Sequence, residues 1–60
     1  MKKVFNENGT FYGVAHKIAQ DNNNLIVTMD GDFPGMAEKN VVFVGGSVVY
    51  EDGNRIYIHY

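Results

Sequence analysis

The segment that decides the fold class is the last third of the chain, Asn40 to Tyr60, with the sequence NVVFVGGSVVYEDGNRIYIHY. It contains three short runs rich in β-branched and aromatic residues, and two pairs of turn residues, Gly45-Gly46 and Asp52-Gly53, separate them. Two-residue hairpin loops require positive φ angles, which glycine adopts without steric cost. The segment therefore predicts three antiparallel strands joined by two tight hairpins.

The rest of the chain adds two or three strands. We expect a first strand over residues 3–5, a turn over residues 7–9, and further strands before and after the polar turn of residues 21–24. Residues 13–20 fit both the strand period and the helical period, and a short helix over residues 14–21 is the alternative. A strand is preferred because the apolar run 25–29 needs a neighbour to pair with, and because Tyr12 and Gly13 would cap a helix poorly.

The predicted fold is therefore all-β: a small antiparallel meander of five or six strands, in the form of an SH3-like open barrel. A curled sheet with one short helix is the alternative. Sixty residues make one domain, residues 1–60, and a chain of this length buries only about 60% of the surface that its unfolded form exposes. No cysteine is present, so neither a disulfide nor a cysteine-bound zinc ion supplements this small core.

Charge and hydropathy exclude several classes of protein. The formal net charge is -2, whereas duplex-binding proteins carry a basic excess. No apolar run reaches transmembrane length, and the polar residues 6–9 stand where a secretion signal would continue as an apolar run. The expected location is the cytoplasm, without a membrane contact.

Side-chain alternation sorts the C-terminal segment into two faces, if both hairpin loops have two residues. The first face is aliphatic and is the expected core: Val42, Val44, Val49, Ile56 and Ile58. The second face collects aromatic, guanidinium and imidazole groups: Val41, Phe43, Val48, Tyr50, Arg55, Tyr57 and His59. A shift of one residue in the pairing would exchange the faces, and a three-residue loop over 51–53 would pair Tyr50 with Asn54 instead.

The second face is the candidate binding site, because the solvated face of an antiparallel sheet is normally polar. Tyrosine and arginine are enriched where protein interfaces bind tightly. Two alternatives stay open: the N-terminal strands cover this face, or it stacks single-stranded bases. The expected partner-binding residues are Phe43, Tyr50, Arg55, Tyr57 and His59, with Phe33 and Met36 of the connection 30–39 either joining them as a binding tip or plugging the barrel end.

No catalytic constellation is visible, and the sequence predicts no enzyme, no cofactor and no metal site. Ser47 follows two glycines but lacks the surroundings of a nucleophile elbow. His16 and His59 stand far apart in the sequence, and the Asp30-Gly31-Asp32 stretch lacks the pattern of a calcium loop.

The expected function is that of a non-enzymatic protein-binding module, such as a small phage or prophage protein that binds a host protein and modulates or inhibits it. Its partner is a protein, nucleic acid is unlikely as a ligand, and the alternative is a β-barrel that binds single-stranded nucleic acid weakly. A homodimer is also expected, because the core is small and the strand over residues 56–60 offers an edge for pairing. Val48 and Tyr57 would then lie in the interface between the two copies.

Overall fold

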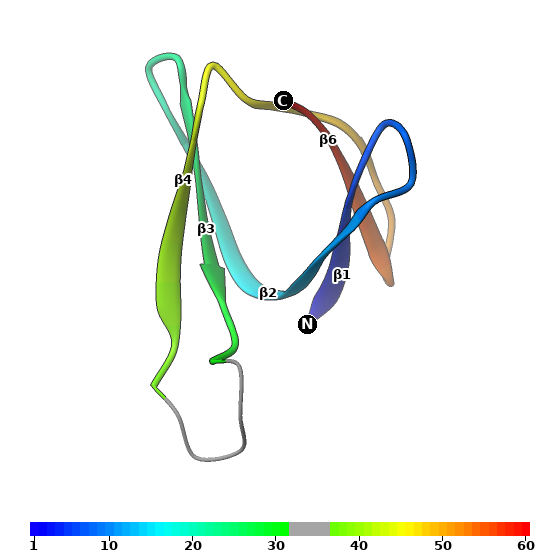
Figure 1. Cartoon of the computed structure of the whole chain (residues 1–60), viewed down its shortest axis with the longest axis vertical. Helices are drawn as coiled ribbons and strands as arrows, with labels where there is room; N and C mark the ends of the chain where they lie inside the picture. Colours follow the sequence, from blue (N-terminus) through cyan, green and yellow to red (C-terminus); the bar gives the residue numbers. More distant parts are fainter. Residues whose placement is uncertain (32–36) are drawn as a thin grey trace.

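The computed structural model describes residues 1–31 and 37–60, which form a single six-stranded sheet (Figure 1). Its strands are β1 Lys2–Asn6, β2 Phe11–Asp21, β3 Asn24–Met29, β4 Lys39–Val44, β5 Ser47–Glu51 and β6 Arg55–His59. The predicted all-β class is confirmed, and the ambiguous residues 13–20 belong to β2 rather than to a helix. Across the described residues no helix is long and apolar enough to cross a membrane.

Local turn chemistry forms the first two hairpins as the sequence predicts. Gly9 adopts a φ of 88° in the turn between β1 and β2, and the Asn6 side chain accepts hydrogen bonds there from the backbone N–H groups of Asn8 and Thr10, at 2.9 Å each. Asn22 adopts a φ of 54° in the turn between β2 and β3. Asparagine tolerates this left-handed conformation better than most residues, which accounts for the run of asparagines at this position.

The hairpin between β5 and β6 is also confirmed, but its register differs from the expected one. The Asp52 N–H donates to the Arg55 carbonyl at 3.0 Å, so the turn is centred one residue later than the Asp-Gly pair suggests. Tyr50 lies opposite Tyr57 instead of Arg55, and a bulge between Val48 and Tyr50 shifts the pairing. Between the turn and the bulge, the pairing differs from the expected one by two residues. Since side chains alternate with a period of two, Tyr50 and Tyr57 stay on the same face.

The hairpin expected at Gly45-Gly46 does not form, and this is a correction to the predicted meander. The sheet order is β4-β3-β2-β1-β6-β5, so β4 and β5 are the two edge strands. The two glycines connect these two edge strands, and Figure 1 shows the curl of the sheet between its edges. Gly45 has a φ of 76° and donates a hydrogen bond to the Asn23 carbonyl at 2.7 Å, and a Cβ on Gly46 would lie 2.8 Å from the Phe43 Cβ.

The sheet is mixed rather than wholly antiparallel, because β1 and β6 pair in parallel. Lys3 lies opposite Arg55, Val4 opposite Ile56, and Phe5 opposite Tyr57. The last strand therefore lies inside the sheet and is not the free edge that the sequence suggested.

One face of the curled sheet holds the core, and this corrects the assignment of faces on β4. Phe43 is 5% exposed and lies opposite Leu25, whereas Val44 is 70% exposed. The cause is that β4 pairs with β3 and not with β5, so Phe43 shares the buried face of β3. Val42 of the expected core is exposed as well, while Val41 packs against the core. On β5 the bulge between Val48 and Tyr50 has the same effect, so Val49 is exposed and Val48 packs against the core. The buried set is Val4, Ala15, Leu25, Val27, Met29, Phe43, Ile56 and Ile58.

We predict that Phe43→Ala costs about 3 kcal/mol or more in the free energy of unfolding, because it leaves a cavity in the core. Val44→Ala, one residue further along the same strand, should change it by less than about 0.5 kcal/mol. Urea unfolding followed by circular dichroism measures both, and Phe43→Leu gives an intermediate cost if the alanine variant does not fold. Equal costs at the two positions would contradict the observed faces of β4.

Candidate functional site

A row of four aromatic side chains crosses the outer face of the sheet. Phe11 of β2 pairs with Phe5 of β1, Phe5 with Tyr57 of β6, and Tyr57 with Tyr50 of β5. Each of four neighbouring strands thus contributes one ring at the same level. We call these residues the aromatic row.

The rings of the aromatic row form a continuous apolar surface. Ring centroids are 5.5 Å apart for Phe11 and Phe5, 5.3 Å for Phe5 and Tyr57, and 6.0 Å for Tyr57 and Tyr50. Phe11 and Tyr50, at the two ends, are 53% and 55% exposed. The row faces away from the core, because the alternate residues of β1 and β6, among them Val4, are buried on the opposite face.

Charged groups flank the aromatic row on both sides. Lys3 and Arg55 pair across β1 and β6 and are exposed, two residues before Phe5 and Tyr57, so they share the face of the row. His59 lies two residues after Tyr57, where its Nδ1 contacts the Glu7 carboxylate of the β1–β2 turn. The basic pair and the histidine–glutamate pair therefore border the row from opposite directions.

The turn between β5 and β6 holds the end of the row. The Tyr50 hydroxyl donates a hydrogen bond to Asp52 Oδ2 at 3.1 Å, and this bond, together with the carboxylate charge, raises the pKa of Tyr50. Asp52 Oδ1 accepts hydrogen bonds from the backbone N–H groups of Asn54 at 2.7 Å and of Arg55 at 2.8 Å. These two bonds lower the pKa of Asp52, because they stabilise its charged form.

Four of the predicted binding residues lie together on the outer face, namely Tyr50, Arg55, Tyr57 and His59. Phe43 does not join them, because it is buried, with its ring centroid 5.3 Å from that of Tyr12 and 5.0 Å from that of Tyr60. The predicted residues Phe33 and Met36 lie outside the described residues.

The other half of the row, Phe5 and Phe11, was not among the residues predicted from the sequence. Strands were expected near both, but their position beside Tyr57 depends on the parallel pairing of β1 with β6. The local signal that was available is the alternation of Phe5 with Val4. This alternation indicates that the two side chains lie on opposite faces of the sheet, but it does not indicate which strand pairs with β1.

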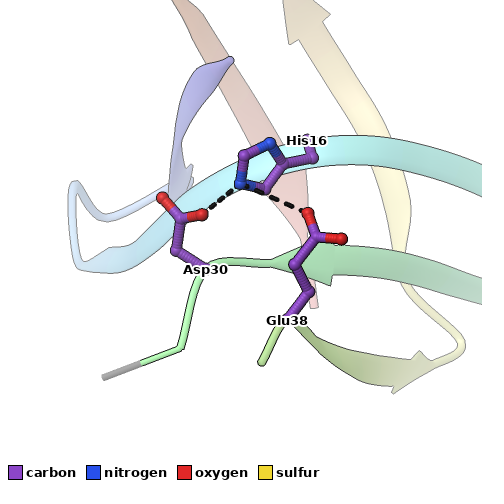
Figure 2. A group of neighbouring side chains, drawn as sticks. All are labelled: His16, Asp30 and Glu38. Atoms are coloured by element: carbon purple, nitrogen blue, oxygen red, sulfur yellow. Dashed lines mark hydrogen bonds and ion pairs between the residues drawn. The ribbon is translucent and has the colours of Figure 1, made fainter. Parts of the chain in front are cut away.

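A second group of polar side chains lies on the other half of the sheet, where β2, β3 and β4 meet (Figure 2). His16 Nε2 hydrogen-bonds Asp30 Oδ1 and lies 3.4 Å from Glu38 Oε2. Each of these side chains offers one atom that can bind a metal ion, and the three atoms all lie within 4.8 Å of one another. We call this set the His16 group.

We predict that Asp52→Ala destabilises the fold at neutral pH and that this cost shrinks in acid. A carboxylate whose pKa is lowered on folding contributes stability above its ordinary pKa, and the contribution is lost as the pH falls below about 4. Thermal unfolding of both proteins at several pH values measures the difference. A cost that stays constant through the acid range would show that the charge of Asp52 is not what stabilises the turn.

No protein-family model, curated protein sequence or solved structure matches the chain. No relative therefore supplies an activity or a partner by comparison. The features that bear on function are the aromatic row and the His16 group.

Proposed function

We propose that this chain is a non-enzymatic protein-binding module and that the aromatic row is its docking surface. The observation that supports this most directly is the exposure of Phe11 and Tyr50 at the two ends of a continuous row of rings. The solvated face of an antiparallel sheet is normally polar, and the apolar residues on a protein surface are usually scattered singly. Four adjacent rings on one outer face depart from both patterns.

Aromatic pairing within the sheet accounts for only part of this arrangement. Cross-strand aromatic pairs stabilise a sheet by roughly 0.2–1 kcal/mol each, which accounts for the contact between Phe5 and Tyr57 in the middle of the row. The ends of the row gain less, because Phe11 and Tyr50 are each more than half exposed to water. Covering them with a partner removes apolar surface from water, at about 25 cal/mol per Å², before the cost of association.

The charges around the row define the chemistry of the partner. Among the described residues, neither Lys3 nor Arg55 has a carboxylate oxygen within 4.0 Å, although the charge of Arg55 also acts on Asp52. A partner carboxylate can accept two parallel hydrogen bonds from the Arg55 guanidinium, with the Lys3 ammonium beside it. The fitting partner segment therefore places apolar or aromatic side chains on the row and an acidic residue over the basic pair.

The edge of the sheet next to Tyr50 offers a second form of contact. β5 is an edge strand, so one side of its backbone has no partner strand within residues 1–31 and 37–60. An extended segment of the partner can add to such an edge through main-chain hydrogen bonds. Its alternate side chains would then continue the aromatic row by one strand.

Single-stranded nucleic acid fits this surface less well than a protein does. Rings beside Lys3 and Arg55 can stack bases, yet the whole chain carries only five basic residues and a net charge of -2. Asp52 and Glu7 add negative charge beside the row. Capture of a host protein by a small phage or prophage protein, acting as an inhibitor, is the biological setting that we propose for this surface.

We predict that Tyr50→Glu and Phe11→Glu each abolish capture of the partner, because each places a charge on the apolar row. Both side chains are more than half exposed, so the variants should keep the wild-type circular dichroism spectrum. Tyr50→Phe and Phe11→Tyr are the matched controls, since they keep the rings. The measurement is affinity capture from a lysate, with the bound proteins quantified by mass spectrometry for all five forms.

The supporting outcome is a protein held by the wild type and by both controls but by neither glutamate variant. Proteins held equally by all forms would contradict docking through the row. Loss of folding in both glutamate variants would also contradict it, because the rings would then be structural. A labelled single-stranded oligonucleotide that binds the wild type and is lost in the same two variants would favour the nucleic-acid alternative.

We also propose that the chain forms a homodimer, through the β4 edge rather than through the last strand. Val42 and Val44 are 49% and 70% exposed on this edge strand, and such an edge pairs readily with another copy. A two-fold axis at β4 would join two sheets and leave both aromatic rows free.

We predict that sedimentation equilibrium at micromolar concentration gives twice the monomer mass of 6.7 kDa. Val44→Lys should restore the monomer, because a lysine on an edge strand opposes pairing with a second copy. Val49→Lys, at an exposed valine of the other edge strand, is the control and should stay dimeric. A wild-type protein that sediments as a monomer throughout would refute the dimer.

A further inference from the structure

We propose that the His16 group binds a divalent transition-metal ion of the zinc class, with His16, Asp30 and Glu38 as its protein ligands. The site lies on β2 and at the two ends of the connection between β3 and β4 (Figure 2), and it shares no residue with the aromatic row. The metal-site proposal does not depend on the proposed docking surface, because the two involve different residues.

The backbone places each of the three ligands. A bulge in β2 lies between Ala15 and Lys17, so His16 is an extra residue without a direct partner on β3. Such a bulge redirects a side chain that regular pairing would fix. Asp30 directly follows β3, where its N–H donates to the Val14 carbonyl at 3.1 Å and anchors it next to the bulge.

The two carboxylates face one another across the strands. The last pair between β3 and β4 is Met29 with Lys39; Asp30 directly follows β3, and Glu38 directly precedes β4. Like charges at opposed positions of an antiparallel pair destabilise it, unless a cation lies between them. Figure 2 shows His16 Nε2 joined by dashed lines to an oxygen of each carboxylate, and a cation bound by these three atoms would offset the repulsion.

The separation between the donor atoms of His16 and Glu38 fits a small dication. Two donor atoms that are each about 2.1 Å from one tetrahedral ion lie about 3.4 Å apart. His16 Nε2 and Glu38 Oε2 are 3.4 Å apart. The hydrogen bond between His16 and Asp30 would be replaced, since both atoms would bind the metal instead of each other. All three residues are exposed, so an ion can enter without opening the fold.

The donor set selects the type of metal. One imidazole nitrogen with two carboxylate oxygens suits zinc and its first-row neighbours, whereas calcium and magnesium prefer oxygen alone. With three protein ligands, a tetrahedral ion keeps one position for water. The ion would then link β2 to the segments next to β3 and β4. Because the unfolded chain does not hold the three ligands together, the ion would stabilise the folded state.

The test is titration of the metal-free protein with Zn²⁺ by calorimetry, together with the thermal midpoint in excess zinc and in chelator. The wild type should bind one ion per chain, and its midpoint should rise by at least about 4 °C, because the ion binds the folded state. His16→Ala and Glu38→Gln should each weaken zinc binding by more than about 10-fold. Loss of a group that only hydrogen-bonds to a metal ligand already lowers metal affinity by about that factor, and these variants remove a ligand itself.

His59→Ala is the matched control, because His59 contacts one carboxylate in the described part of the chain, that of Glu7. It should bind zinc as the wild type does. In nuclear magnetic resonance spectra, zinc should shift the ring signals of His16 and leave those of His59 in place. An absence of binding in the wild type would overturn the proposal, and so would an equal loss of affinity in His59→Ala. If His16→Ala does not fold, the exposed Glu38→Gln variant decides.

Discussion

The structure depends on the parallel pairing of β1 with β6. On one side of β1 lie β2, β3 and β4, each paired with its neighbour in sequence, and on the other side lie β6 and β5. The Lys3 N–H donates to the Asn54 carbonyl at 3.0 Å, and Val4 meets Ile56 on the buried face. Without this pair the chain would be a four-stranded meander, β1 to β4, and a separate β5–β6 hairpin, which would be marginally stable at best on its own.

The same pairing determines what lies on each face. Within the core it joins Val4 to Ile56, and on the outside it joins Phe5 to Tyr57. The aromatic row is therefore continuous only because the two units share one sheet. The curl of that sheet also lets two residues, Gly45 and Gly46, connect strands that lie at opposite edges.

The turns and hairpins that depend on residues close together in the sequence could be predicted from it. The turns at Gly9, Asn22 and Asp52 follow from local backbone preferences, and the hairpins around them are present. The Gly45-Gly46 turn has the same local appearance but a different role, because the partner of β4 is fixed by the fit of Phe43 against the core and not by the turn.

The half of the aromatic row on β5 and β6 was accordingly predicted, whereas the half on β1 and β2 depended on a long-range pairing that no local pattern encodes. The His16 group escaped prediction for a related reason, since its geometry needs both the bulge in β2 and the register of β3 with β4.

The parallel pair also has a consequence for the order of folding. β1 is made early and its partner β6 late, with Lys3 and Arg55 brought together across most of the chain. Contacts between residues so far apart in sequence form slowly compared with hairpins, because the loop between them must first close. Until then Phe5 and Phe11 have no neighbour on the far side of β1. The complete aromatic row therefore exists only after the last strand has docked, and a partner that binds the row as we propose would select fully folded molecules over intermediates.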